Sequence, residues 1–243
     1  IHGIHMAITA ENVAERYQVT REAQDELAVE GHQRAARAIA EGRFSEQIIP
    51  VEIKTRKGSV FFYEDEHVRP DVDKASVKAM KPAFKEGGTV TAANASGIND
   101  GAAAVVLATA SEVEKRGLKP MARIVSWAHA GVEPEYMGVG PVKAVPIALK
   151  RAGLTLDDMD VIEANEAFAA QALAVAGELG FDRDKLNPNG SGIALGHPVG
   201  ATGTILTVKA TYELIRTGGR YALMTMCIGG GQGIALIIER VAE

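Results

Sequence analysis

The chain has 243 residues, of which 47% are hydrophobic, 23% charged and 5% aromatic, the balance of an ordinary globular α/β protein. Its formal net charge of −5 argues against nucleic-acid and anionic-membrane partners. One cysteine cannot form an internal disulfide, no apolar run reaches the length of a membrane span, and no signal peptide is recognisable at Ile1-His2-Gly3. We therefore expect a cytoplasmic protein with no nucleic-acid or membrane partner.

The first half of the chain predicts helices and short strands in an irregular order. Residues 1–19 show no clear period, whereas one i, i+4 ridge predicts a helix from Thr20 to Glu41 that Gly42 ends. The small polar run at 89–101 predicts a turn that lines a cleft. Acidic clusters at 64–66 and 71–73 lack the spacing of a calcium loop, so no metal site is expected. The remaining expected elements are strands at 48–53 and 60–63, a short helix at 76–80, a buried strand at 102–108, and a helix at 111–116 capped by Ser111 and ended by Gly117.

From Met121 onward the pattern is a regular alternation of strands and helices. Two strand-to-helix connections predict parallel strands in a sheet covered by helices. The expected strands are 122–127, 161–163, 221–226 and 234–239, and the expected helices are 142–151, 166–179 and 201–216.

Three residues with chemically useful side chains fall on loops of this alternating unit. His197 lies in a glycine-rich loop before a helix, where it is either a turn histidine or part of a phosphate-binding loop that lacks the Walker lysine. Cys227 follows a strand at its C-terminal end. It is either a small buried hydrophobe or a reactive thiol beside glycine N–H groups that stabilise an oxyanion. Asn165 is either a helix N-cap or an amide that holds a water or carbonyl.

The motifs around these residues together resemble one known family. They are Asn-Glu-Ala-Phe at 165–168, Gly-His-Pro at 196–198 and Cys-Ile-Gly-Gly-Gly at 227–231, and in this order they resemble the thiolases, the acyl-CoA C-acyltransferases. The resemblance implies an α/β, thiolase-like fold of mixed five-stranded sheets covered by helices. It further implies the latter part of a CoA-binding loop domain at 1–88, the closing strand and helix of an N-terminal domain at 89–119, and a complete C-terminal domain at 120–243.

The resemblance also assigns catalytic roles. His197 is expected to deprotonate a nucleophilic cysteine and, with a water held by Asn165, to donate to the thioester oxygen. Cys227 is expected to move the substrate Cα proton, and the N–H of Gly229 to form part of a second oxyanion hole.

Coenzyme A and acyl-CoA are expected as substrates, with no cofactor and no metal. Arg69 and Ser76 are assigned to the nucleotide end, although Arg69 is alternatively a solvated surface charge. Phe84 is assigned to the tunnel or alternatively to core packing. The residues assigned to CoA or acyl binding are His5, Arg69, Ser76, Phe84, Ser96, Met137 and Phe168.

The resemblance also implies that the nucleophilic cysteine is not among these residues, because Cys227 matches the acid/base cysteine. The chain looks like the C-terminal three-fifths of a thiolase, and we expect it to be inactive without the N-terminal half. An alternative is a non-catalytic thiolase-like protein that binds acyl-CoA or lipid; a decarboxylating condensing enzyme would need a histidine where Cys227 stands. By analogy we expect a homo-oligomer, a tetramer built as a dimer of dimers.

Overall fold

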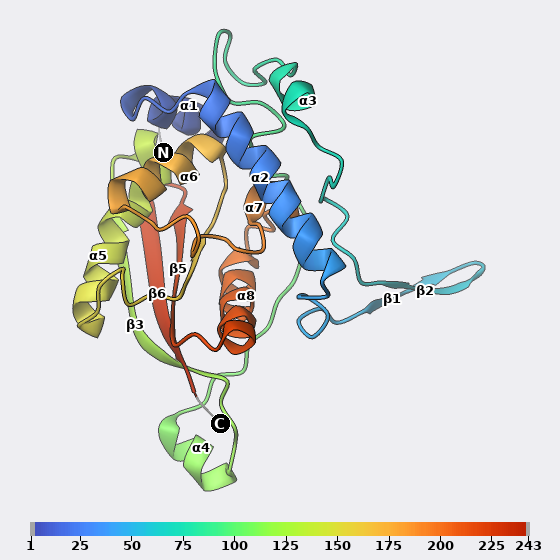
Figure 1. The fold of residues 1–243 in the computed structure, drawn as a ribbon, viewed down its shortest axis with the longest axis vertical. Helices are drawn as coiled ribbons and strands as arrows, with labels where there is room; N and C mark the ends of the chain where they lie inside the picture. Colours follow the sequence, from blue (N-terminus) through green and yellow to red (C-terminus); the bar gives the residue numbers. More distant parts are fainter. Residues whose placement is uncertain (1–2, 242–243) are drawn as a thin grey trace.

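The computed structural model describes residues 3–241, and its centre is a four-stranded sheet with helices on both faces (Figure 1). The strand order is β3-β6-β5-β4, in which β6 pairs antiparallel with β3 and β5, and β4 pairs parallel with β5. A single parallel bridge between Ile162 and Leu186 continues the sheet beyond β4. The expected mixed, helix-covered sheet is therefore confirmed, but it has four strands where five were predicted. The strands are β3 Ala122–Gly131, β4 Val161–Ala164, β5 Tyr221–Ile228 and β6 Gln232–Arg240.

Each face of the sheet buries a separate apolar cluster. Side chains alternate along a strand, so Leu223 packs with residues of α5 and α6 whereas its neighbour Met224 packs against α8. This alternation explains why helices cover the sheet on both sides, as in a sheet that contains parallel strands. The covering helices are α5 Gly140–Ala152, α6 Ala169–Leu179 and α8 Thr202–Thr217.

Two helices begin the described chain: α1 lies at the end of the sheet at which β5 turns into β6, and α2 runs from there past α6 and α7 (Figure 1). α2, Arg21–Ala40, matches the prediction, and the Thr20 hydroxyl caps its first turn. α1, Met6–Arg16, was not predicted, because no clear period was found in residues 1–19. Its N-terminus is stabilised by His5, whose Nδ1 accepts the N–H of Ala7 at 3.1 Å.

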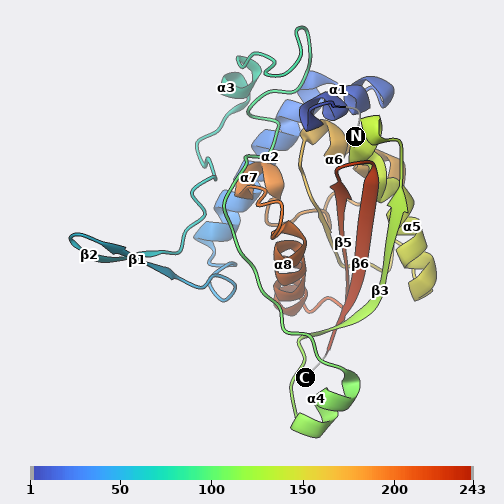
Figure 2. The same ribbon diagram turned by 180° about the vertical axis from the view of Figure 1, so that it is seen from behind.

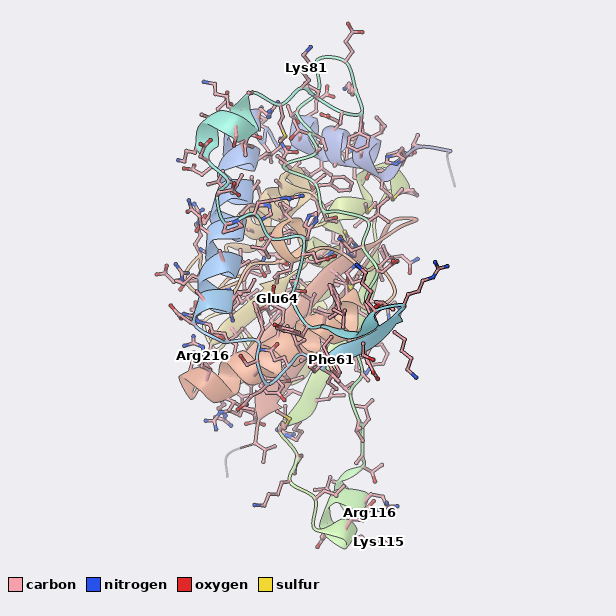
Figure 3. The ribbon with its side chains drawn as sticks, turned by 90° about the vertical axis from the view of Figure 1, so that its right-hand side faces the viewer. Phe61, Glu64, Lys81, Lys115, Arg116 and Arg216 are labelled. Atoms are coloured by element: carbon pink, nitrogen blue, oxygen red, sulfur yellow. The ribbon has the colours of Figure 1, made fainter. Side chains whose placement is uncertain are left out.

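Smaller elements lie at the periphery. A hairpin of β1 and β2 extends sideways away from the body, and α4 lies beyond the far end of the sheet, at the bottom of the view (Figure 2). Phe61 on the hairpin and Arg116 on α4 are labelled in Figure 3, in which the hairpin points toward the viewer. Thr109, not Ser111, caps α4, and Gly117 ends it in the left-handed conformation as expected. The remaining bounds are β1 Val51–Thr55, β2 Gly58–Phe62, α3 Lys74–Lys78, α4 Ala110–Arg116, the 3-10 helix η1 Pro134–Val139 and α7 Gly192–Leu195.

The predicted buried strand at 102–108 does not form. These residues form no helix or strand and are largely exposed; Val106 is 97% accessible. A strand requires a neighbour that pairs with its N–H and C=O groups, and no strand among residues 3–241 lies beside this segment. The apolar residues at 102–108 have strand propensity, but the prediction that they form a strand paired in a sheet is wrong.

No helix within residues 3–241 is both long and apolar enough to cross a membrane. Within the same residues, no group of three or more His, Cys, Asp or Glu side chains is placed to hold a metal ion. The predicted boundaries at 88/89 and 119/120 stay predictions.

Candidate active site

The site is built at the ends of two parallel strands. The pairing of Ala164 on β4 with Thr225 on β5 brings the C-terminal ends of both strands to one edge of the sheet. Asn165 follows at once, and its N–H donates to the Thr225 carbonyl at 2.9 Å. Cys227 lies two residues beyond Thr225 on β5. Asn165 and Cys227 therefore both lie at the carboxyl end of the parallel strands, where α/β proteins place ligands.

Asn165 does not cap a helix. α6 begins at Ala169 rather than at Glu166 as predicted, with Phe168 as its N-cap residue. The side chain of Gln171 reaches back from the first turn of α6, so that Oε1 accepts from the Ala167 N–H at 3.2 Å and Nε2 donates to the Asn165 carbonyl at 3.3 Å. The amide of Asn165 is thus free for another role.

That amide contacts His197. Asn165 Nδ2 lies 3.3 Å from His197 Nε2, and the Asn165 side chain is buried. The oxygen of the same amide, Oδ1, has no hydrogen-bond partner. If residue 192 had a side chain, its Cβ would lie only 2.9 Å from this oxygen. Glycine at 192 therefore leaves room for the amide, and the turn-histidine interpretation of His197 does not account for this contact.

The loop that carries His197 is held by a residue from the small polar run. Asn99 Oδ1 accepts the backbone N–H of His197 at 3.1 Å. Gly196 has a φ of 93°, and a Cβ there would lie 2.6 Å from Asn99 Oδ1. Residues 99–103 and 198–201 also line a shallow hollow, as expected of a turn that lines a cleft. Asn99 was not singled out from the sequence.

Burial sets the protonation of His197. The side chain is half-buried, and burial lowers the pKa of its imidazole below the ordinary value of 6.5. The neutral imidazole is therefore the dominant form at pH 7, which is the form that accepts a proton.

Cys227 is buried in a small apolar cluster with Met137 and Ala167, against which Phe168 packs. Burial disfavours the thiolate and raises the pKa of the thiol to about 11. Cys227 is thus protonated at neutral pH, and its thiolate, once formed, is a strong base. The same packing brings it next to the two residues assigned to the acyl group, Met137 and Phe168.

The glycines after Cys227 form the turn from β5 to β6. Gly229 is exposed, and a Cβ on it would touch only the sulfur of Met6, at 3.8 Å. Gly230 and Gly231 have φ of 89° and 93°, and the Gly231 carbonyl accepts the Val132 N–H at 2.7 Å. The turn is therefore fixed by backbone geometry that favours glycine, and Gly229 keeps an open approach to its main chain.

Residues assigned to the pantetheine tunnel lie close to the strand ends or to α1. Ser96 donates its backbone N–H to the Ala167 carbonyl at 3.0 Å, and an adjacent bridge pairs Ala95 with Phe168. The rings of His5 and Phe84 stack with centroids 5.3 Å apart. Phe84 is 42% exposed, so it does not pack in the core of residues 3–241.

The two residues assigned to the nucleotide end lie elsewhere, on and beside α3, which packs against α2. Ser76 takes part in a capping box, in which its N–H donates to Asp73 Oδ1 at 2.7 Å. Arg69 is exposed and donates its backbone N–H to His32 Nδ1 at 3.1 Å. Neither residue contacts the Asn165–His197 pair, so their assignment depends on the resemblance alone.

Comparison with known proteins agrees with this geometry. The model of the thiolase N-terminal domain matches residues 1–111, and that of the thiolase C-terminal domain matches residues 118–240. The chain belongs to the thiolase family. The thiolase-like fold expected from the motifs is confirmed with it.

Several named thiolase relatives are similar along almost the entire chain. Beta-ketothiolase BktB of Cupriavidus necator is 62% identical over 241 residues, which cover 99% of this chain and 61% of that protein. An acetyl-CoA acetyltransferase of Escherichia coli K12 is 53% identical, with 99% and 61% covered. The solved acetyl-CoA acetyltransferase of Bacillus anthracis is 48% identical with a TM-score of 0.97, again with 99% and 61% covered. This thiolase chain thus spans about three-fifths of the length of these relatives.

Behind the strand ends, the thiolase fold contains a buried polar network that sequence reasoning missed. Lys209 on α8 donates to Glu163 Oε2 at 2.7 Å and to the Gly190 carbonyl at 2.6 Å. Asn187 pairs with both backbone groups of Ala164, at 2.8 and 2.9 Å, and donates to Glu166 Oε1 at 2.8 Å. The Asn187 side chain thereby bonds to the last residue of β4 as a neighbouring strand would, and it fixes the chain on either side of Asn165. No spacing rule pairs these residues, which come from three separate segments.

Proposed function

We propose that the complete protein to which these residues belong is an acyl-CoA C-acyltransferase. It catalyses the reversible Claisen condensation of an acyl-CoA with acetyl-CoA, or the CoA-dependent thiolysis of a 3-oxoacyl-CoA. The observation that carries this proposal is the contact between Asn165 Nδ2 and His197 Nε2 at the end of β4, next to the strand that presents buried Cys227. A base, an amide and a proton-carrying thiol at one sheet edge suit chemistry on a thioester.

In the condensation direction the acyl group is carried as a thioester on a nucleophilic cysteine that His197 has deprotonated. Cys227 first gives its proton to the CoA thiolate that leaves when the acyl group is transferred. The Cys227 thiolate then takes a proton from Cα of acetyl-CoA, and the enolate oxygen is stabilised by His197 and a water held by Asn165. The Cα–C bond then forms as the enolate attacks the acyl carbon, and the C–S bond to the nucleophile breaks. The N–H of Gly229 stabilises the oxyanion of this second step, and donors of this type are worth roughly 3–4 kcal/mol each.

In thiolysis the same groups act in reverse. Cys227 returns a proton to the departing acetyl enolate and accepts one from the thiol of the incoming CoA. The high pKa of about 11 that burial gives Cys227 supports this role, because the thiolate of a weakly acidic thiol is a strong base toward a carbon acid.

The nucleophile of this reaction is a second thiol. The 243 residues contain one cysteine, Cys227, which matches the acid/base position of the family. We therefore propose that the nucleophile belongs to the portion of a thiolase that these residues do not span. The 243-residue chain is then inactive when it is assayed alone.

The CoA-binding assignments extend this proposal. Met137 and Phe168 lie near the acyl group, and Ser96 binds the pantetheine arm. His5 and Phe84 line the tunnel, and Arg69 and Ser76 lie at the nucleotide end. A homotetramer formed as a dimer of dimers and a cytoplasmic location are part of the same proposal. Light scattering of the complete protein tests the tetramer.

The function is tested by joining this chain to the N-terminal two-fifths of the Cupriavidus necator relative and measuring acetoacetyl-CoA cleavage. The joined protein is expected to turn over, and the 243-residue chain alone is not. Turnover by the chain alone would overturn the missing-nucleophile argument. A joined protein that binds CoA tightly without any turnover would favour the non-catalytic acyl-CoA-binding alternative.

A further inference from the structure

We propose that Thr202 is a positioning residue that fixes the tautomer of His197. In this arrangement the proton of the neutral ring stays on Nδ1, and Nε2 keeps the lone pair that accepts a proton. The kinetic consequence rests on the proposed function, whereas the tautomer itself can be measured without turnover.

The Thr202 hydroxyl lies between two acceptor-capable atoms. Its Oγ1 is 2.7 Å from His197 Nδ1 and 3.0 Å from the carbonyl oxygen of Pro198. Thr202 is 3% exposed, so no bulk water competes for these contacts. Both short contacts converge on one buried oxygen.

Counting protons sets the direction of both hydrogen bonds. A hydroxyl has one proton to donate and two lone pairs to accept with, whereas the carbonyl of Pro198 can only accept. The Thr202 proton therefore goes to Pro198, and Oγ1 accepts a proton from His197. The donor is the N–H at Nδ1, which leaves Nε2 without a proton in the neutral ring.

The opposite side of the ring agrees with this assignment. Asn165 Nδ2, a donor, lies 3.3 Å from His197 Nε2, where it meets a lone pair rather than another N–H. The three hydrogen bonds thus run in one direction, from Asn165 through the ring and Thr202 to Pro198. Burial lowers the pKa of His197, so the neutral ring to which this count applies is the form present at pH 7.

The position of Thr202 follows from the start of α8. Thr202 is the first residue of that helix, and its N–H also bonds to the Pro198 carbonyl, at 2.9 Å. The residue before it, Ala201, provides no side-chain cap. The hydrogen bonds to the Pro198 carbonyl thus fix the turn between His197 and α8 and hold the Thr202 hydroxyl next to Nδ1 of the ring.

The test is 15N NMR of histidine-labelled 243-residue chain at pH 7.5, with His197 assigned by the signals lost in His197→Gln. We expect a protonated-type Nδ1 signal and a lone-pair-type Nε2 signal in the wild type and in Thr202→Ser, which keeps the hydroxyl. Thr202→Val, which is nearly isosteric, is expected to give a mixture of both tautomers. Thr211→Val is the matched control, because Thr211 on the same helix donates to the Thr207 carbonyl at 2.8 Å, an intrahelical bond remote from His197.

Two results would overturn the proposal. One is an Nε2-protonated ring in the wild type, which needs no variant to be folded. The other is an unchanged Nδ1-protonated signature in Thr202→Val. In the complete protein, Thr202→Val is expected to lower kcat roughly 10- to 100-fold, the effect of removing the partner that orients a metal-bound histidine, with rescue by Thr202→Ser and little change in KM. If the complete protein proves inactive, the proposed function fails while the tautomer result still stands.

Discussion

Asn165 and His197 are separated by 32 positions in the chain, yet their side chains meet at 3.3 Å. The contact depends on two independent supports. The Thr225 carbonyl and the side chain of Asn187 fix the main chain around Asn165, and Asn99 fixes the main chain of His197. The amide and the imidazole therefore meet because two loops are each tied to a different segment of the fold.

Loss of the Asn165 amide should reduce turnover much more than stability. Asn165→Ala removes the group that orients the ring and holds the catalytic water, so acetoacetyl-CoA cleavage by the complete protein is expected to fall about 10²- to 10³-fold. Asn12→Ala is the control, because Asn12 makes a comparable side-chain bond to the Glu135 carbonyl at 3.1 Å, between α1 and η1. Equal rates for both variants would exclude the catalytic role of Asn165.

Glu166 should make the free energy of unfolding depend on pH in a predictable direction. Burial raises its pKa from 4.5 to about 7, so between these values the folded state binds more protons than the unfolded state. The contribution of Glu166 to stability is therefore present below pH 4.5 and is lost as pH rises to 7. It amounts to at most about 3 kcal/mol.

Glu166→Gln removes this titration while keeping the shape of the side chain. Urea denaturation measures the unfolding free energy of Glu166→Gln and wild type at pH 5 and pH 8. Relative to wild type, the variant should be more stable at pH 8 than at pH 5. Other titrating groups cancel in the difference. A difference that stays constant over this range would show that Glu166 titrates normally.

Removing one member of the Lys209–Glu163 pair should lower the free energy of unfolding. Both side chains are almost fully buried, and Glu163 Oε1 has no partner at all. Lys209→Met leaves an uncompensated buried carboxyl group and is expected to cost about 3–5 kcal/mol, most of which Glu163→Gln should restore in the double variant.

The matched control for this pair is Lys74→Met. Lys74 pairs with Glu26 at 2.6 Å on the surface, with 73% and 58% of the two side chains exposed, so little change in stability is expected. Similar losses in both lysine variants, or no rescue in the double variant, would contradict the account of the buried pair.

Local patterns predicted the elements of the C-terminal half well. The periodicities after Met121 identified every strand of the central sheet. They succeeded because all four strands lie after Met121 and pair with one another. At 102–108 the same type of pattern failed, since pairing depends on residues that periodicity cannot locate. α1 was missed for a related reason, because its buried residues are mostly small and its polar Glu11 is buried too.

The site was predictable in part. The motifs identified Asn165, His197 and Cys227, and the structure brings Asn165 and His197 into contact. The partners Asn99 and Thr202 were missed, because the importance of each lies in a single side-chain oxygen that hydrogen-bonds to His197. Thr202 stands only five positions after His197, so the same glycine-rich loop already contained the signal.

The most direct test concerns Cys227 as the proton carrier. The complete protein is incubated with acetyl-CoA in D₂O, and deuterium incorporation into the acetyl group is followed by mass spectrometry for wild type and Cys227→Ala. The account predicts exchange in the wild type and a loss of about 10²-fold or more in Cys227→Ala, while acetyl transfer to the nucleophilic thiol remains detectable. Exchange at the wild-type rate in Cys227→Ala would contradict it.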